Sequence, residues 1–114
     1  MKLFTTKVHG VLDYLTSATL PALPRMLGWS EGVTTMLTVA GGGALVYSLL
    51  TRYELGLVKV LPMKAHLALD FMSGAALCAG PFLFPDEETS VKGALVGLGL
   101  FEIGASLMTE TEPS

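Results

Sequence analysis

The chain has 114 residues, of which 51% are hydrophobic and 15% are charged, and it carries a formal net charge of −3. Soluble domains carry about 25% charged residues, so this composition excludes an ordinary water-exposed surface. The weak negative charge, without any run of basic residues, excludes nucleic acid as an expected partner.

Four apolar segments bounded by charged residues follow one another along the chain. They span residues 8–24, 32–51, 65–85 and 93–109. Each fits the roughly 17–25 residues that a helix needs to cross a bilayer core. Asp13, Asp70 and Glu102 interrupt three of them, whereas segment 32–51 carries no charge. Because that segment has no face polar enough to meet water, a soluble bundle is the weaker alternative. We predict an all-α, four-helix transmembrane bundle.

Proline, serine and threonine residues mark the expected helix boundaries. We expect Pro21 and Pro24 to end or bend the first helix, because proline lacks the N–H that a helix interior requires. Ser30 is expected to cap the start of the second helix, and Thr89 or Ser90 the start of the fourth. These boundaries divide the chain into two helical hairpins joined by a longer middle loop.

The basic residues are distributed unevenly between the two ends of the predicted bundle. The N-terminal tail and the middle loop carry Lys2, Lys7, Arg52, Lys59 and Lys64. The opposite turns carry only Arg25 and Lys92, beside several acidic residues. Because lysine and arginine concentrate on the cytoplasmic side, we expect both termini and the middle loop in the cytoplasm. Trp29 and Tyr53 are expected at opposite membrane interfaces.

The second half of the chain repeats the first. The corresponding positions are His9 with His66 and Asp13 with Asp70, at an offset of 57 residues, and residues 48–51 with 106–109, at an offset of 58. Two halves that each contain two helices run parallel to each other. We therefore predict two tandem transmembrane hairpins within one domain, residues 1–57 and 58–114, related by an axis along the membrane normal.

The repeated segments also carry a family resemblance. Residues 8–14 (VHGVLDY) and 66–71 (HLALDF) are similar to small bacterial membrane proteins known as SPW-repeat proteins, in which each hairpin's first helix ends in Ser-Pro-Trp. The signature positions here read Leu-Pro-Arg at 23–25 and Gly-Pro-Phe at 80–82, so only the proline is kept. The resemblance implies a duplicated topology in a bacterial inner membrane and no particular activity.

Ionisable and polar residues inside the apolar segments form the candidate functional site. By helical rise they fall in one layer of the cytoplasmic half: His9, Asp13, Tyr47, His66, Asp70 and Glu102. Such groups normally face the bundle interior and find partners. Two interpretations stay open. In the first, each aspartate accepts a hydrogen bond from its own histidine or from a hydroxyl or indole group across the bundle, and the layer fixes helix register. In the second, the layer binds a cation, carries protons or receives a small ligand.

Metal or haem binding is the most specific form of the second interpretation. His9 and His66 could ligate one iron axially, or join the three carboxylates around a divalent ion. The HxxxD spacing is common on helices, so no resident cofactor is predicted, and His9 and His66 are retained as candidate metal ligands.

Small residues repeat every four positions in the second and fourth segments. They are Ala40, Ala44 and Ser48 in one, and Gly93 and Gly97 in the other. Small side chains let membrane helices approach closely. These positions are expected either to pack helices within the bundle or to form the face of a homo-oligomer or membrane-complex partner.

No motif for enzymatic chemistry is present in the sequence. It contains no G-x-S-x-G elbow and no phosphate-binding glycine loop, so we do not expect an enzyme. The expected function is that of a non-enzymatic membrane or accessory protein whose surroundings are the lipid bilayer. The alternatives are a proton or cation transporter, or a channel-like oligomer, and a haem- or metal-binding membrane protein.

Overall fold

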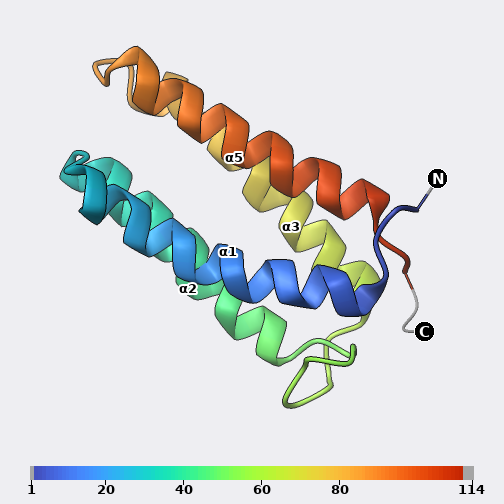
Figure 1. Cartoon of the computed structure of the whole chain (residues 1–114). Coiled ribbons are helices and arrows are strands. Elements are labelled where there is room, and N and C mark those ends of the chain that lie inside the picture. The colour runs from blue at the N-terminus through green and yellow to red at the C-terminus, as the bar shows by residue number, and fades with distance from the viewer. Residues whose placement is uncertain (1, 112–114) are drawn as a thin grey trace.

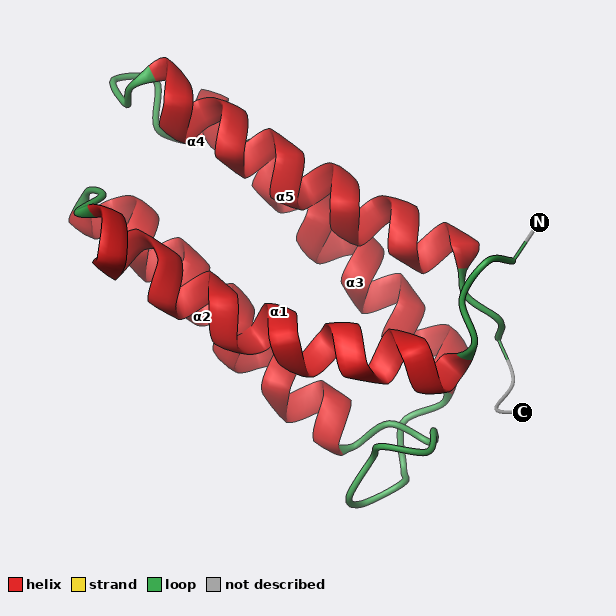
Figure 2. Ribbon diagram, viewed as in Figure 1, coloured by secondary structure: helices red, strands yellow, loops and turns green. Residues whose placement is uncertain are grey.

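The computed structural model describes residues 2–111 and confirms an all-α fold with four main helices. The elements are α1 (Thr6–Leu27), α2 (Glu31–Leu49), α3 (Met63–Cys78), α4 (Gly80–Leu83) and α5 (Thr89–Met108). The helices pack in pairs, α1 against α2 and α3 against α5, to form two antiparallel hairpins (Figure 1). Both described ends of the chain and the loop between α2 and α3 lie at one end of the molecule, and both hairpin turns lie at the other (Figure 2).

Helix α1 runs through both of its prolines, so the expectation that Pro21 and Pro24 end it is wrong, and a bend there stays a prediction. The helix starts with the Thr5 side chain accepting the Val8 N–H and stops only at Gly28, whose φ of 67° ends it in a left-handed turn. Pro21 cannot donate to the carbonyl of Ser17, one turn before it. That carbonyl lies on the α2 side, where Gly41 approaches so closely that a Cβ would stand 2.8 Å from it.

The same close approach recurs in the second hairpin. A Cβ on Gly99 of α5 would stand 2.5 Å from the Gly74 carbonyl of α3 and 2.6 Å from Cys78 Sγ. Gly74 and Cys78 lie 57 residues after Ser17 and Pro21, and Gly99 lies 58 after Gly41. Corresponding positions therefore join the two helices of each hairpin, and each junction needs a glycine.

The helix starts follow the sequence only in part. Ser30 caps α2 as expected, with its Oγ accepting the Val33 N–H at 3.3 Å. Helix α5 instead begins at Thr89 with Glu88 at the capping position, so the expected cap at Thr89 or Ser90 is wrong. The Lys92 N–H already bonds to the Glu88 carbonyl at 3.0 Å, which makes Thr89 the first residue inside the helix.

The apolar residues divide between a small core and a large exposed surface. The core near the hairpin turns consists of Leu20, Val33, Leu37, Leu77, Val91 and Leu95. Helices α2 and α5 are long and apolar enough to cross a membrane, yet only 28% and 33% of their apolar stretches are buried within the molecule. A core helix of a soluble protein would be mostly covered, so these two helices present apolar surface outward.

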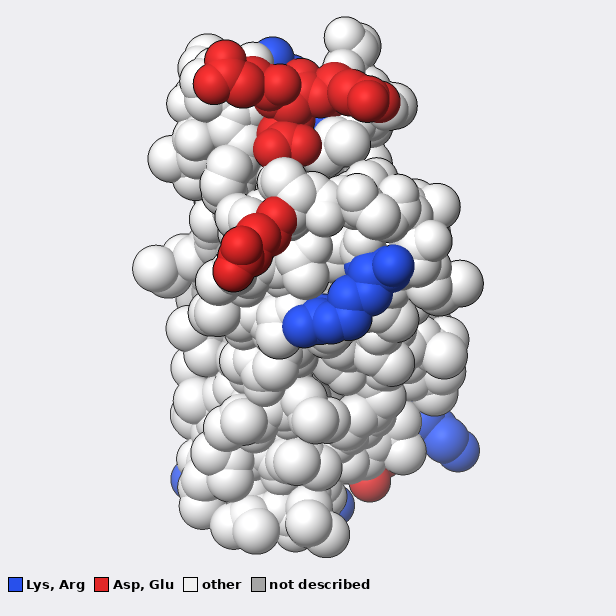
Figure 3. Space-filling view, turned by 90° about the vertical axis from the view of Figure 1, so that its left-hand side faces the viewer, with Lys and Arg blue, Asp and Glu red and all other residues white. Residues whose placement is uncertain are grey.

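Charged side chains gather at the end that carries the hairpin turns. Figure 3 looks onto this end: acidic side chains cluster over the α4–α5 turn, and most of the remaining surface is uncharged. The sequence of that turn supplies Asp86, Glu87 and Glu88. The opposite end carries the basic loop and the N-terminal lysines. The molecule therefore has an acidic end and a basic end along its long axis.

Candidate functional site

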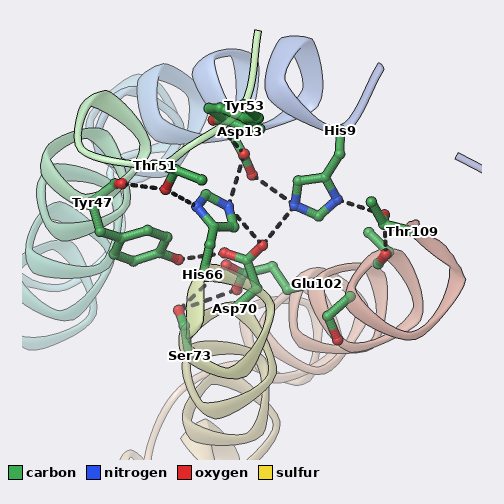
Figure 4. Close-up of polar contacts among 12 residues, drawn as sticks. His9, Asp13, Tyr47, Thr51, Tyr53, His66, Asp70, Ser73, Glu102 and Thr109 are labelled. Carbon is green, nitrogen blue, oxygen red and sulfur yellow. Dashed lines mark hydrogen bonds and ion pairs between the residues drawn. The ribbon is translucent and has the colours of Figure 1, made fainter. Parts of the chain in front are cut away.

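Two histidines and two aspartates from the first helix of each hairpin meet between the hairpins, in the half of the molecule that carries the middle loop (Figure 4). His9 and Asp13 stand one turn apart on α1, and His66 and Asp70 stand one turn apart on α3. Their exposed fractions are 2%, 8%, 0% and 5%, in that order. The structure thus contains a buried His/Asp cluster, built from the four residues that the sequence repeat pairs.

Each imidazole of the His/Asp cluster faces both carboxylates. His9 Nε2 lies 2.7 Å from Asp70 Oδ2 and 3.1 Å from Asp13 Oδ1. His66 Nε2 lies 2.9 Å from Asp13 Oδ2 and 3.1 Å from Asp70 Oδ2. Each histidine is therefore closer to the aspartate of the other hairpin than to its own. One ligand atom from each of the four residues fits within 4.8 Å of all the others, a grouping able to hold a metal ion.

Two threonines determine which nitrogen of each histidine carries a proton. Thr109 Oγ1 lies 2.7 Å from His9 Nδ1, and Thr51 Oγ1 lies 2.7 Å from His66 Nδ1. Each hydroxyl donates its only hydrogen to a backbone carbonyl of its own helix at 2.6 Å, Thr109 to Ala105 and Thr51 to Tyr47. Both threonines must therefore accept the hydrogen bond from Nδ1–H. This leaves each Nε2 facing the carboxylates, as a donor in the imidazolium (His9 Nε2 lies 2.7 Å from Asp70 Oδ2) and as a lone pair in the neutral ring.

Short parallel bridges hold the two threonines in place. Thr109 pairs with Phe4 and Thr51 pairs with Leu61. Backbone hydrogen bonds of 3.0 Å join Phe4 to residues 108 and 110, and one of 2.8 Å joins Arg52 to Leu61. Each bridge lies where a chain segment passes the C-terminal end of α5 or α2, and it fixes the hydroxyl against the histidine of the other hairpin.

Two tyrosines complete the hydrogen bonding of the aspartates. The Tyr53 hydroxyl donates to Asp13 Oδ2 at 2.8 Å, and the Tyr47 hydroxyl donates to Asp70 Oδ1. Tyr53 is 1% exposed, so its ring is buried inside the protein and does not face a membrane interface. Its loop folds back under the helices and inserts the ring beside His66. Burial, followed by the charge of Asp13, raises the pKa of the Tyr53 hydroxyl, which keeps it a donor.

Glu102 lies beside the His/Asp cluster but outside the group of four. Its side chain is buried and accepts long hydrogen bonds from Ser73, at 3.3 and 3.4 Å. It lines a cavity of about 20 Å³ together with His9, Asp13 and Asp70. A space of this size holds about one water molecule. Ala44, which the repeat relates to Glu102, lines the same cavity, so this carboxylate has no counterpart in the first hairpin.

The small residues singled out in the sequence take different positions. Ala44 and Ser48 are buried and Ala40 is half-buried, whereas Gly93 and Gly97 are exposed, and a Cβ on either would meet nothing within 4 Å. The two glycines therefore do not pack helices among the described residues. A role in an oligomer face stays a prediction.

Sequence reasoning missed Thr51, Thr109 and Tyr53 as parts of the site. Both threonines end the repeated four-residue segment at 48–51 and 106–109, so a signal for them was present. Tyr53 has no such signal, because it lies in a loop with no periodicity.

Comparisons with known proteins leave the family open. No family model matches the chain, and no solved structure matches it. An uncharacterised protein of Aquifex aeolicus is 30% identical over 103 residues, which covers 86% of this chain and 24% of that protein. The chain thus spans about a quarter of the length of this relative.

Proposed function

We propose that this chain is an integral membrane protein that binds a divalent transition-metal ion between His9, Asp13, His66 and Asp70. One observation carries the proposal: both imidazoles are tied by Nδ1–H to a threonine and turn Nε2 toward the same two carboxylates. Metal-ligating histidines almost always donate their other N–H to an oxygen, which fixes the ring and leaves a lone pair for the metal.

Two imidazoles and two carboxylates suit a divalent metal ion that is intermediate between hard and soft. Imidazole nitrogen is typical of zinc and iron sites, and carboxylate oxygen is accepted by zinc, iron and manganese. Metal–ligand bonds of about 2.0–2.2 Å around a tetrahedral ion place the ligand atoms roughly 3.4 Å apart. The nitrogen–oxygen separations of 2.7–3.1 Å would need to widen by about 0.3–0.7 Å. The two aspartates balance the charge of a divalent ion.

The hydrogen bonding of His66 supports an ion over a purely structural cluster. Its Nε2 is buried and lacks an aligned hydrogen bond, although two carboxylate oxygens lie at 2.9 and 3.1 Å. Imidazolium–carboxylate pairing, which would make the cluster fix helix register, aligns the N–H with an oxygen, as at His9 Nε2 and Asp70 Oδ2, but not at His66. A metal ion between the groups does not require that alignment.

The geometry argues against two alternatives. The His9 and His66 rings stand 5.3 Å apart, nearly edge-on, with carboxylates between them, which leaves no room for a porphyrin. The adjoining cavity accommodates about one water molecule, too little space for a hydrated ion to pass. Binding therefore fits the site better than transport.

The proposed membrane location rests on where α1 and α3 point their polar groups. Both helices turn their histidine and aspartate inward, and their outward faces are apolar. The exposed residues of these faces include Val8, Val11, Leu15, Leu69, Phe71 and Met72. We infer that α1 and α3 cross the bilayer beside α2 and α5, with both termini cytoplasmic. Membership of the SPW-repeat proteins is part of this proposal and rests on the repeated motif alone.

Metal titration of the purified chain tests the proposed site. The chain in detergent, stripped with a chelator, should bind one Zn²⁺, Mn²⁺ or Fe²⁺ by calorimetry and elemental analysis. His66→Ala should weaken that binding at least 100-fold, because it removes a ligand. Tyr14→Phe serves as the control, since its hydroxyl bonds only to the Leu55 carbonyl, at 2.7 Å. No stoichiometric ion in the wild type, or equal binding by His66→Ala, would refute the proposal.

A further inference from the structure

A groove runs down the outer face of the second hairpin, between α3 and α5. It has a volume of about 440 Å³ and begins at the end of the molecule where the chain termini lie. Its walls include Lys2, Lys64, Leu67, Phe71, Met72 and Leu107. The described lining contains no acidic residue, which separates this groove from the acidic end of the molecule.

Two lysines stand together at the mouth of the groove. Lys64 lies in the first turn of α3, where no side chain caps the helix and the helix dipole is positive. Lys2 reaches the same place from the N-terminal segment, and its Nζ donates to the Leu107 carbonyl at 3.3 Å. Two ammonium groups and a helix start therefore face one opening, an arrangement that attracts a phosphate group.

Below the lysines the groove is apolar and open. Phe71, Met72 and Leu107 are 43%, 66% and 59% exposed. Met72 lies eight residues beyond Lys64, which on a helix places it roughly 12 Å deeper. Positive charge at one end and an apolar channel of this length match a phosphate headgroup and the upper part of an acyl chain.

The first hairpin covers its corresponding face with its own chain. Gly10 and Tyr14, which the repeat relates to Leu67 and Phe71, lie under Leu55 of the middle loop. A Cβ on Gly10 would stand 2.9 Å from Leu55 Cδ1, and the Tyr14 hydroxyl donates to the Leu55 carbonyl. The described residues provide no such cover for the second hairpin.

We propose that the groove between α3 and α5 is a binding site for an anionic phospholipid. The phosphate lies between Lys2 and Lys64, and one acyl chain runs along Phe71, Met72 and Leu107. Basic pockets between helices on the cytoplasmic side recognise such headgroups. This inference rests on the membrane location proposed above and not on the metal site.

Native mass spectrometry of the purified full chain in detergent tests the lipid site. Phosphatidylglycerol should bind at one copy per chain and at least 10-fold more tightly than phosphatidylcholine, because each lysine near an anionic headgroup contributes about a factor of five. The double variant Lys2→Gln/Lys64→Gln should lose this preference. The control Lys7→Gln/Lys59→Gln removes the same charge outside the groove and should keep it.

A second variant tests the groove itself. Ala68 is exposed on the groove wall, so Ala68→Trp fills the channel without disturbing the core or the lysines. It should abolish one-to-one phosphatidylglycerol binding. Equal binding of the two lipids, equal losses in both lysine double variants, or unchanged binding by Ala68→Trp would each overturn the inference. Extraction of cell membranes with alkaline carbonate checks the membrane location separately, so failure of the lipid site can be told from failure of the proposed location.

Discussion

Thr51 and Thr109 orient the histidines across the boundary between the hairpins. Each hydroxyl follows the last turn of one hairpin, gives its hydrogen to that helix, and accepts Nδ1–H from the histidine of the other hairpin. These hydrogen bonds fix the orientation of each imidazole ring, and so they set the direction in which each Nε2 lone pair points. The two threonines thus support the metal ligands without contacting the proposed ion.

Replacing either threonine by valine should weaken metal binding about 10- to 100-fold, the usual effect of removing a partner that orients a ligand. Valine keeps the shape of the side chain and removes the acceptor for Nδ1–H. Competition with a chromophoric chelator measures the affinity. Thr19→Val is the matched control, because Thr19 is exposed and bonds only to the Leu15 carbonyl, at 2.7 Å. Wild-type affinity in both Thr51→Val and Thr109→Val would contradict this orienting role.

The residues at the centre of the site could be predicted to different extents. His9, Asp13, His66 and Asp70 are identifiable because charged groups inside apolar segments stand out and recur at a constant offset. Their pairing across the hairpins was not predictable, since helical spacing suggests bonds within each helix. The contribution of Tyr53 depends on the path of a loop, which no local pattern encodes.

The helices of each hairpin depend on one glycine contact. Gly99 approaches the Gly74 carbonyl and Cys78, and Gly41 approaches Ser17 and Pro21 in the same way. Without a side chain at these positions the helix backbones come close enough for Cα–H···O contacts. Gly93 and Gly97 lie on the other side of α5 and have no such role in the described structure.

Gly99→Ala should therefore lower the free energy of unfolding by about 1–3 kcal/mol, the usual cost of forcing a methyl group into a packed interface. Gly93→Ala should leave stability unchanged or raise it by up to about 1 kcal/mol, because alanine is the better helix former. Thermal or denaturant unfolding in detergent, followed by circular dichroism, measures both variants. A similar loss of stability in both variants would mean that the close contact between α3 and α5 contributes no more to stability than an exposed position of α5.

The hydropathy of the sequence predicted the four main helices. The proline and capping residues were poor guides to where the helices begin and end. Four main helices follow from four apolar segments. Pro21 and Pro24 do not stop α1, because a helix tolerates a missing donor where a neighbouring backbone packs against the freed carbonyl. Helix α5 begins at Thr89 because its first backbone hydrogen bond runs from the Lys92 N–H to the Glu88 carbonyl. Glu88 is therefore the capping residue, in place of Thr89 or Ser90.

The whole molecule has a basic end and an acidic end, separated by apolar surface. The basic residues of the tail and middle loop lie beside the chain termini, and the acidic α4–α5 turn lies at the opposite end (Figures 2 and 3). The positions of the charged residues along the sequence indicated this division. The way the middle loop folds back, bringing Tyr53 under the helices, could not be seen from composition.

Cysteine labelling should show the two ends on opposite sides of the membrane. In a Cys78→Ala background, Glu87→Cys should react with an impermeant maleimide in intact cells, because the acidic turn faces outward in the proposed orientation. Leu57→Cys in the middle loop should react only after the cells are permeabilised. The reverse pattern would invert the orientation, and labelling of both sites in intact cells would rule out a membrane-spanning arrangement.

The bond between Thr109 and His9 joins residues 100 positions apart in the chain. During synthesis, His9 and Asp13 therefore emerge long before the residues that complete their surroundings. Within the first hairpin Asp13 can already accept from Tyr53, but His9 gains the partner for its Nδ1 only after Thr109 has left the ribosome. The site can therefore form only after both hairpins have been made, and a chain that stops short of Thr109 leaves His9 without its orienting partner.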